Sequence, residues 1–363
     1  MYHHHGSYGH TRRILHFIAA LKNLPLEIVI IAGGELTPFM HPLFPTSVKL
    51  VELPPLISDG HFKHLRPVNT ALTLNETKGQ RLDLIKKIIR TEAPDILCCE
   101  FFPFGRHQIA EEFTTAIQLV REQQKKTFVI STMRDLLGVH LSKEKKELIG
   151  RYSQLFDDIL VHGDKDFLSF DQELIPLIQD KIFYTGYLTH APPLQRKIHS
   201  PKRILVSMGG GRDGEKIIEI IFQLAQALPQ HHFKLITGEF SPPNDLPKSA
   251  NVEVLTLGPD LLQELKRAHF FISMCGYNTF CEAYLSQIPT LFIPRDFEPE
   301  QLLRAREASL KVEWMSYIPL SKLTVEAIFT KIQNDFLEIT DIYPINMSGL
   351  ENVQQYFRKL LSC

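Results

Sequence analysis

The sequence has almost no net charge, few cysteines and no long apolar segment. Its 363 residues include 40 Lys and Arg against 41 Asp and Glu, which gives a formal net charge of −1. Such a balance gives no reason to expect nucleic acid or a strongly acidic partner. The sequence lacks an apolar run long enough to cross a bilayer, and we find no secretory signal pattern. We therefore expect a cytoplasmic protein.

The five cysteines lie at scattered positions, and only Cys98 and Cys99 are neighbours. The sequence contains no Cys-x-x-Cys pair and no Cys/His spacing typical of a metal site. We expect reduced, buried thiols, and neither a metal nor a cofactor.

The length of the chain favours two domains, and strand and helix patterns alternate along it. Pro192-Pro193 begins a basic tract, poor in apolar residues, that runs to Lys202 and is typical of a linker. We expect an α/β protein with a first domain over residues 1–190 and a second over residues 201–363.

The second domain contains one stretch, residues 270–301, that predicts a strand, a tight turn, a helix, another strand and a loop. Small residues, Ser273 and Gly276, fall in the turn, and Asn278 and Thr279 predict side-chain caps for a helix over residues 279–286. A helix N-terminus among small residues suits phosphate. A plain βαβ unit needs the same residue types, so the pattern alone leaves both interpretations open.

Polar residues further along this stretch fit a bound nucleotide-sugar. Glu282 lies one helical turn after Thr279, from where a carboxylate reaches a ribose hydroxyl. Arg295, Glu300 and Gln301 follow the next strand at its carboxyl end, where open α/β sheets bind ligands. Glu300 and Gln301 would hold sugar hydroxyls.

A glycine run, residues 209–211, follows the predicted first strand of the second domain, residues 203–207, and precedes a helix. This is a second candidate for cradling phosphate. It lacks the spacing of a dinucleotide-binding fingerprint.

The first domain begins with a shortened strand pattern, residues 1–5, and a turn that contains Gly6 and Gly9. His10 then stands at the entrance of an amphipathic helix, residues 11–21. A histidine in such a turn is either a structural cap or a candidate base. Arg12 and Arg13 on this helix are either phosphate or acceptor contacts or part of a solvated face.

Glu100 ends the buried strand pattern 94–100. Its carboxylate could orient His10, accept from an acceptor hydroxyl, or pair with Arg106. Residues 56–79 show no clear period, and we interpret them as an acceptor loop, a membrane-surface contact or a solvent loop.

The pattern SxxGxxTxxEAxxxxxPTLxIPR, residues 273–295, followed by a Gln resembles nucleotide-sugar glycosyltransferases of the GT-B fold. The nearest group is MurG-like, with the family 28 C-terminal type and a "predicted glycosyl transferase" branch. The GxxGH motif ending at His10 and the segment PDILCCEFFPFGRH, residues 94–107, also resemble this group. One departure is Tyr277, which stands where the family often has a second Gly.

The resemblance implies two Rossmann-like domains that face each other across a cleft, with the last helix crossing back to the first domain. We expect His10 and Glu100 to be catalytic, with His10 as the base. The predicted donor-binding residues are Gly9, Gly209, Gly210, Gly211, Ser273, Gly276, Tyr277, Asn278, Thr279, Glu282, Arg295, Glu300 and Gln301.

The implied activity is transfer of a sugar from a nucleotide-sugar, taken to be a UDP-sugar, to an acceptor hydroxyl, with inversion and without metal. The acceptor would be a glycan, a lipid-linked molecule or a small molecule, and peripheral contact with the inner face of the membrane stays open. Three alternatives share the fold: a nucleotide-sugar hydrolase, a non-catalytic nucleotide- or glycan-binding protein, and a sugar-nucleotide 2-epimerase.

Overall fold

The computed structural model describes residues 2–3, 8–58, 64–135, 141–168, 173–190, 202–208, 215–237, 246–255, 261–296, 299–334 and 341–362. The chain forms two compact units. Unit 1 consists of residues 1–188 together with 348–363, and unit 2 consists of residues 189–347. The predicted linker after His190 lies outside the described residues.

Unit 1 is built on a seven-stranded parallel sheet in the order β3-β2-β1-β6-β7-β8-β9. Its strands are β1 (Tyr2–His3), β2 (Ile28–Ala32), β3 (Val48–Glu52), β6 (Ile96–Glu100), β7 (Phe128–Arg134), β8 (Asp158–His162) and β9 (Ile182–Tyr184). The short β1 is central, because Tyr2 pairs with Ile31 of β2 on one side and with Cys99 of β6 on the other. The strand order therefore reverses between β1 and β6.

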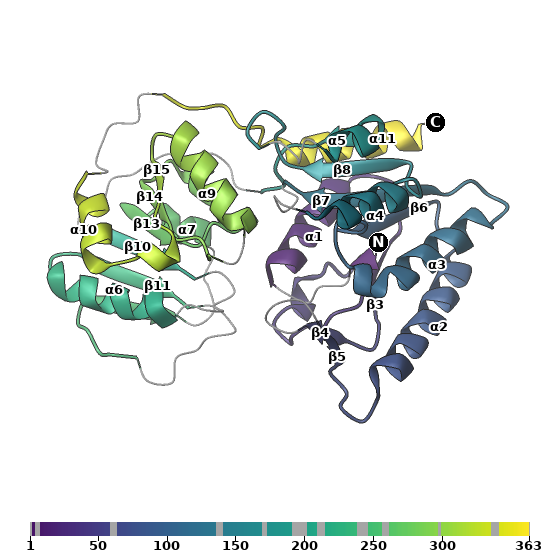
Figure 1. Ribbon diagram of the computed structural model, residues 1–363, viewed down its shortest axis with the longest axis horizontal. Helices are drawn as coiled ribbons and strands as arrows, with labels where there is room; N and C mark the ends of the chain where they lie inside the picture. Colours follow the sequence, from purple (N-terminus) through teal and green to yellow (C-terminus); the bar gives the residue numbers. More distant parts are fainter. Residues whose placement is uncertain are drawn as a thin grey trace. The chain divides into compact units, whose positions relative to one another are not determined.

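Helices cover both faces of this sheet (Figure 1). They are α1 (Tyr8–Leu21), α2 (Leu74–Glu92), α3 (Ala110–Arg121), α4 (Lys143–Ser153), α5 (Ile175–Ile178) and α11 (Gly349–Leu361), with short 3₁₀ turns η1 (His41–Leu43), η2 (His107–Ile109) and η3 (Gln179–Lys181). Apolar side chains of α2 and α3 form one core with the sheet, and those of α1 and α11 form another. This is the layering of a doubly wound α/β domain.

The region predicted to lack regular structure contains two strands and the start of a helix. β4 (Leu56–Ser58) pairs antiparallel with β5 (Leu65–Pro67), and α2 begins at Leu74. The helix start is fixed by a capping box in which the side chains of Thr73 and Glu76 each accept from the other's backbone N–H. The structureless interpretation was wrong because this Thr-x-x-Glu signature was overlooked.

Unit 2 has a six-stranded parallel sheet in the order β12-β11-β10-β13-β14-β15. Its strands are β10 (Arg203–Ser207), β11 (His232–Ile236), β12 (Val252–Leu255), β13 (Phe270–Ser273), β14 (Thr290–Phe292) and β15 (Met315–Tyr317). Its helices are α6 (Glu215–Ala227), α7 (Leu261–Leu265), α8 (Tyr277–Ser286), α9 (Pro299–Lys311) and α10 (Val325–Asn334), with the 3₁₀ turn η4 (Leu320–Lys322). The strand order reverses between β10 and β13.

The last helix, α11, belongs to unit 1. Phe357 packs edge-on against Phe17 of α1 with ring centroids 5.7 Å apart, and Tyr356 donates to Asp158 of β8 at 2.6 Å. Where the chain re-enters unit 1, the Gly349 N–H donates to Tyr187 O at 3.2 Å. A Cβ at Gly349 would lie 2.4 Å from that oxygen, so only glycine permits this approach.

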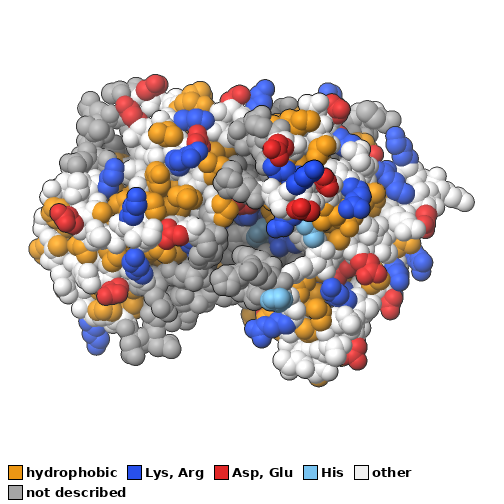
Figure 2. Space-filling view, in the orientation of Figure 1, with side chains coloured by type: hydrophobic (Ala, Val, Ile, Leu, Met, Phe, Trp, Pro, Cys, Tyr) orange, Lys and Arg blue, Asp and Glu red, His pale blue; other side chains and the backbone are white. Residues whose placement is uncertain are grey.

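Within the described part of the chain, no helix combines the length and apolar character needed to span a membrane. Lys/Arg and Asp/Glu side chains are interspersed over the face of the molecule shown in Figure 2.

Candidate functional site

The reversal of strand order in unit 1 brings two predicted catalytic residues together. His10 lies in the first turn of α1, after β1, and Glu100 is the last residue of β6. Ligands of open α/β sheets bind outside the carboxyl ends of the strands at such a switch point. β1 and β6 are neighbours there, so His10 and Glu100 reach the same place from segments about 90 residues apart.

The two side chains form a hydrogen-bonded dyad. His10 Nδ1 lies 3.0 Å from Glu100 Oε1, and the side chains are 13% and 1% exposed. An ionised carboxylate only accepts, so the imidazole must carry its proton on Nδ1 and donate it to Glu100. The neutral ring then keeps its lone pair on Nε2.

Arg13 is the third member of this cluster. It lies one turn after His10 on α1, is 4% exposed, and forms an ion pair with Glu100 Oε1. Its guanidinium nitrogen is also 2.9 Å from His10 Nδ1, but because Nδ1 carries a proton, the guanidinium donates to the carboxylate. A solvated position for Arg13 is therefore wrong.

Arg106 contributes a longer contact, with its guanidinium 3.9 Å from Glu100 Oε2. The sequence left open whether Glu100 orients His10 or pairs with Arg106. In the structure Glu100 contacts both, with the shorter contact to His10.

The electrostatics of the cluster favour a neutral His10. Burial is the largest cause that holds the pKa of His10 well below its ordinary value; Glu100 opposes the shift, and Arg13 and Arg106 add to it. His162 at the end of β8 is also buried, and burial followed by the charge of Arg13 lowers its pKa to about 3. Both rings are neutral at pH 7.

Phe101, directly after Glu100, has a backbone conformation that sequence reasoning missed. Its φ is 65°, in the left-handed region that a bulky residue rarely adopts. Its ring meets His10 edge-on at 6.3 Å and lies 5.5 Å and 5.3 Å from the guanidinium carbons of Arg106 and Arg134. A Cβ at Gly105 would lie 2.7 Å from the ring. Such outliers concentrate at functional sites, and no pattern in the sequence signals this one.

The switch point of unit 2 lies between β10 and β13. Ser273, the last residue of β13, is 2% exposed, and its hydroxyl donates to Ser207 O of β10 at 2.8 Å. The glycines predicted to share this edge, residues 209–211, fall outside the described residues.

The helix after β13 begins two residues earlier than predicted. α8 starts at Tyr277, and Gly276 is its N-cap with φ −68° and ψ 157°. Asn278 and Thr279 therefore lie inside the first turn, and the prediction that they cap the helix was wrong. The extended conformation of Gly276 supplies the N-cap geometry without a side chain.

Gly276 has room beside it among the described residues. A Cβ built there would meet only Thr279 Oγ1, at 4.0 Å. The first turn of an α-helix presents N–H groups that have no acceptor within the helix, which makes this end suited to an anion.

The other predicted donor residues differ in exposure. Glu282 of α8 is 2% exposed, so a ribose would meet a nearly inaccessible carboxylate. Gln301 Oε1 accepts the Arg295 backbone N–H at 3.3 Å, which ties the first turn of α9 to the loop after β14. Glu300 and Arg295 are partly exposed.

Gly9 is exposed in the first turn of α1. Arg304 of α9, which sequence reasoning missed, is 1% exposed and donates to Cys275 O at 2.7 Å, so it supports the loop before α8.

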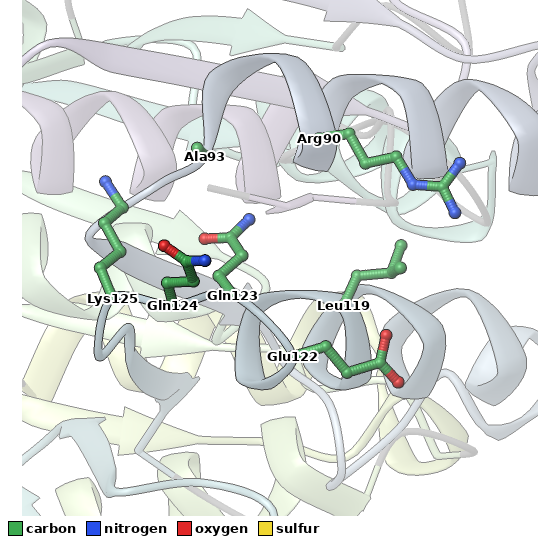
Figure 3. A pocket seen from close by; sticks show the side chains of 7 residues that line it. All are labelled: Arg90, Ala93, Leu119, Glu122, Gln123, Gln124 and Lys125. Carbon is green, nitrogen blue, oxygen red and sulfur yellow. The ribbon is translucent and has the colours of Figure 1, made fainter.

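A surface depression of about 560 Å³ lies elsewhere in unit 1 (Figure 3). It is lined by Arg90, Ala93, Leu119, Glu122, Gln123, Gln124 and Lys125. These residues come from the carboxyl ends of α2 and α3 and the segments after them, which lead into the amino ends of β6 and β7. The depression is therefore at the opposite edge of the sheet from His10 and Glu100.

From the sequence we expected no metal, but that prediction left out an Asp-x-Asp spacing, a possible metal-binding pattern, at Asp164 and Asp166 after β8. Asp164 Oδ1 accepts the Asp166 backbone N–H at 2.8 Å and closes a turn. Among the described residues, no group of three or more His, Cys, Asp or Glu side chains is placed to hold a metal ion.

Comparisons with known proteins agree with this architecture. Residues 204–355 match the glycosyltransferase family 28 C-terminal domain. A UDP-N-acetylglucosamine--N-acetylmuramyl-(pentapeptide) pyrophosphoryl-undecaprenol N-acetylglucosamine transferase of Campylobacter jejuni (strain 81-176) is 24% identical over an alignment of 190 residues, and the match covers 47% of this chain and 53% of the relative. The chain thus spans about half the length of the curated relatives it matches.

Solved structures are similar over nearly the whole chain. Acinetobacter baumannii MurG has a TM-score of 0.64 at 14% identity, covering 99% of this chain and 98% of that one. The fold is GT-B. CalG4, the calicheamicin glycosyltransferase, has a TM-score of 0.62 at 16% identity, with 99% and 93% covered. The resemblance to the MurG-like GT-B glycosyltransferases is therefore confirmed.

Proposed function

We propose that this GT-B protein is a glycosyltransferase that moves a sugar from a UDP-sugar to an acceptor hydroxyl, with inversion and without metal. The observation that carries the proposal is the His10–Glu100 dyad at the switch point of unit 1. The family 28 match in the C-terminal half and the UDP-sugar donor in the name of the Campylobacter relative support the choice of donor.

Unit 1 supplies the base in this proposal. Attack on the anomeric carbon requires an acceptor oxygen that loses its proton as the bond forms. Nε2 of neutral His10 accepts that proton, and the resulting imidazolium is stabilised by Glu100 at Nδ1. A single displacement with one base inverts the anomeric configuration.

Unit 2 holds the leaving nucleoside diphosphate. The transition state has oxocarbenium character, and negative charge builds up on the departing diphosphate. The first turn of α8 offers preorganised N–H donors and the positive end of the helix dipole to that charge. In the proposal, these N–H donors and the helix dipole take the role of a divalent cation. Because Asp164 and Asp166 have an Asp-x-Asp spacing, the reaction must also be tested for dependence on metal.

Donor binding is tested by calorimetric titration of UDP into the wild type and Gly276→Ala. The added methyl group fits the folded chain but narrows the approach to the first turn of α8. We expect UDP affinity to fall at least tenfold, which is about 1.4 kcal/mol. Gly79→Ala is the matched control, since a Cβ there also meets open space. Equal UDP affinity in all three proteins would show that the donor does not bind at the first turn of α8.

The reaction is tested by incubating the protein with UDP-sugars and a panel of glycan, lipid-linked and small-molecule acceptors, with product analysis by mass spectrometry and NMR. We expect a glycoside of inverted configuration, unchanged by EDTA. His10→Gln should lower the rate by about 10²- to 10⁴-fold and leave UDP affinity unchanged. Free sugar plus UDP would instead indicate a hydrolase, an epimerised donor a 2-epimerase, and no product a binding protein.

We also propose that the protein works in the cytoplasm with peripheral contact at the inner face of the membrane. Support comes from the undecaprenol-linked acceptor in the name of the Campylobacter relative. Co-sedimentation with vesicles of anionic and neutral lipid tests this, and recovery only in the supernatant with both would overturn it.

A further inference from the structure

The base of the dyad stands beside a buried carboxylate, which poses an electrostatic problem. Glu100 is 1% exposed and lies 3.0 Å from His10 Nδ1. A lone carboxylate at that distance favours the charged form of an imidazole. His10 would then hold a second proton as half of an ion pair, and an imidazolium cannot accept a proton from an acceptor hydroxyl.

A second cation beside Glu100 removes this difficulty. Arg13 lies on the same helix as His10, three residues later, and its guanidinium contacts the same carboxylate oxygen, Oε1. It is 4% exposed, so water screens the pair little. The guanidinium remains charged at any pH that the fold survives.

We propose that Arg13 is a positioning residue of the dyad: it neutralises Glu100, so that His10 stays a neutral imidazole that donates from Nδ1 and keeps its Nε2 lone pair for the acceptor. This rests on the proposed function of His10 as the base.

The other groups around His10 fit this role for Arg13. Glu100 comes from β6, Arg13 from α1 itself, and Arg106 from the loop after β6, and the ring of Phe101 lies edge-on to His10. Arg106 is 3.9 Å from the opposite carboxylate oxygen, Oε2. Its longer contact makes it the weaker neutralising partner. The low pKa of His10, with Arg13 among the causes after burial, has the direction this role requires.

The test is a histidine NMR titration of the full chain, which reports the tautomer and pKa of His10 without any substrate. The His10 signals are those lost in His10→Gln. In the wild type we expect a neutral ring with the proton on Nδ1 from pH 8 to below pH 6. In Arg13→Met the His10 pKa should rise by at least about one unit, a tenfold change in the protonation constant. In Arg13→Lys, which keeps the charge, it should stay near the wild-type value.

Two controls separate this role from a merely structural one. Arg12→Met removes a charge from the neighbouring, partly exposed position of α1 and should move the His10 pKa far less than Arg13→Met. The double variant Arg13→Met/Glu100→Gln should return His10 to a low pKa, because the unneutralised carboxylate is gone.

An unchanged His10 pKa in folded Arg13→Met overturns the proposal. If that variant does not fold, a His10 in Arg13→Lys that titrates near pH 7 or above overturns it. The NMR titration does not depend on turnover, so the two proposals can fail separately. If the titration contradicts the role of Arg13 but sugar transfer is observed, the proposed function stands. If the titration is as expected but no transfer is observed, only the proposed function is refuted.

Discussion

Two buried arginine–glutamate pairs among the described residues of unit 1 have different surroundings. Arg81 of α2 is fully buried and binds Glu112 of α3 through two hydrogen bonds of 2.8 Å and 2.9 Å. Its remaining terminal nitrogen donates to Gly33 O and Pro54 O, each at 2.7 Å. Arg13 and Glu100 are similarly buried, but their carboxylate is shared with His10.

The difference lies in whether a neighbour of the pair can change its charge. The Arg81 pair has no histidine beside it and fixes the segments after β2 and β3 through Gly33 O and Pro54 O, so it acts as a structural tie. The Arg13 pair has an imidazole as third member, and proton movement on that ring changes the net charge of the cluster. The same two residue types thus serve the scaffold in one place and a candidate base in the other.

The largest expected effect comes from breaking the structural pair. Arg81→Met leaves Glu112 buried without its cation and two carbonyl groups without their donor, so the unfolding free energy should fall by about 3–5 kcal/mol. Urea denaturation followed by circular dichroism measures this.

The control is Arg81→Met/Glu112→Leu, which removes both charges. Because no uncompensated carboxylate remains, the double variant should recover part of the lost stability. Equal losses in the single and double variants would show that the carbonyl contacts, and not the ion pair, make Arg81 important.

A smaller loss is expected from Arg13→Met, about 1–3 kcal/mol, because His10 can take up a proton and replace the missing cation. We expect the folded pKa of His10 in this variant to lie above its unfolded value. The compensation is therefore complete at low pH and disappears as the pH rises through the folded pKa. Urea denaturation at pH 6 and pH 9 should show the larger penalty, relative to wild type, at pH 9. A pH-independent penalty would count against any exchange of charge within the cluster.

The smallest effect concerns the pH dependence of the wild type. His162, whose pKa is lowered to about 3 by burial and Arg13, stays neutral in the folded chain while its unfolded form binds a proton below about pH 6.5. Its contribution is present above pH 6.5 and falls as the pH drops, by about 1.4 kcal/mol at pH 5.5.

His162→Asn should reduce the loss of unfolding free energy between pH 7.5 and 5.5 by about 1 kcal/mol. Arg81→Met/Glu112→Leu, which removes both charges of the structural pair and leaves no titratable group there, should retain the wild-type pH dependence. If His162→Asn kept the wild-type pH dependence and the change in the structural pair abolished it, the pH sensitivity would come from the Arg81–Glu112 pair and not from His162.

The sequence predicts much of the fold because the signals for it are local. Alternating apolar strands and amphipathic helices indicate a doubly wound architecture, and the GT-B fold is confirmed. The three-residue β15 escaped prediction because Met315–Tyr317 is too short to show a period. α8 was started too late because Gly276 caps it through backbone geometry alone.

The candidate site is partly predictable for a topological reason. The rule that strands end at a common edge places His10 and Glu100 together. The burial of Arg13 depends on which side of α1 meets the end of β6, and a helix of mixed apolar and basic residues does not reveal that. The conformation of Phe101 and the near-complete burial of Glu282 are likewise set by tertiary packing.

The return of α11 to unit 1 has a consequence for synthesis of the chain. Val353 and Phe357 complete the core that also contains Phe17 of α1, so this core is assembled from residues that are made before and after unit 2. Unit 2 is a continuous segment that can fold while it leaves the ribosome. Unit 1, which carries the candidate base, must leave part of one face of its sheet uncovered until α11 has been made.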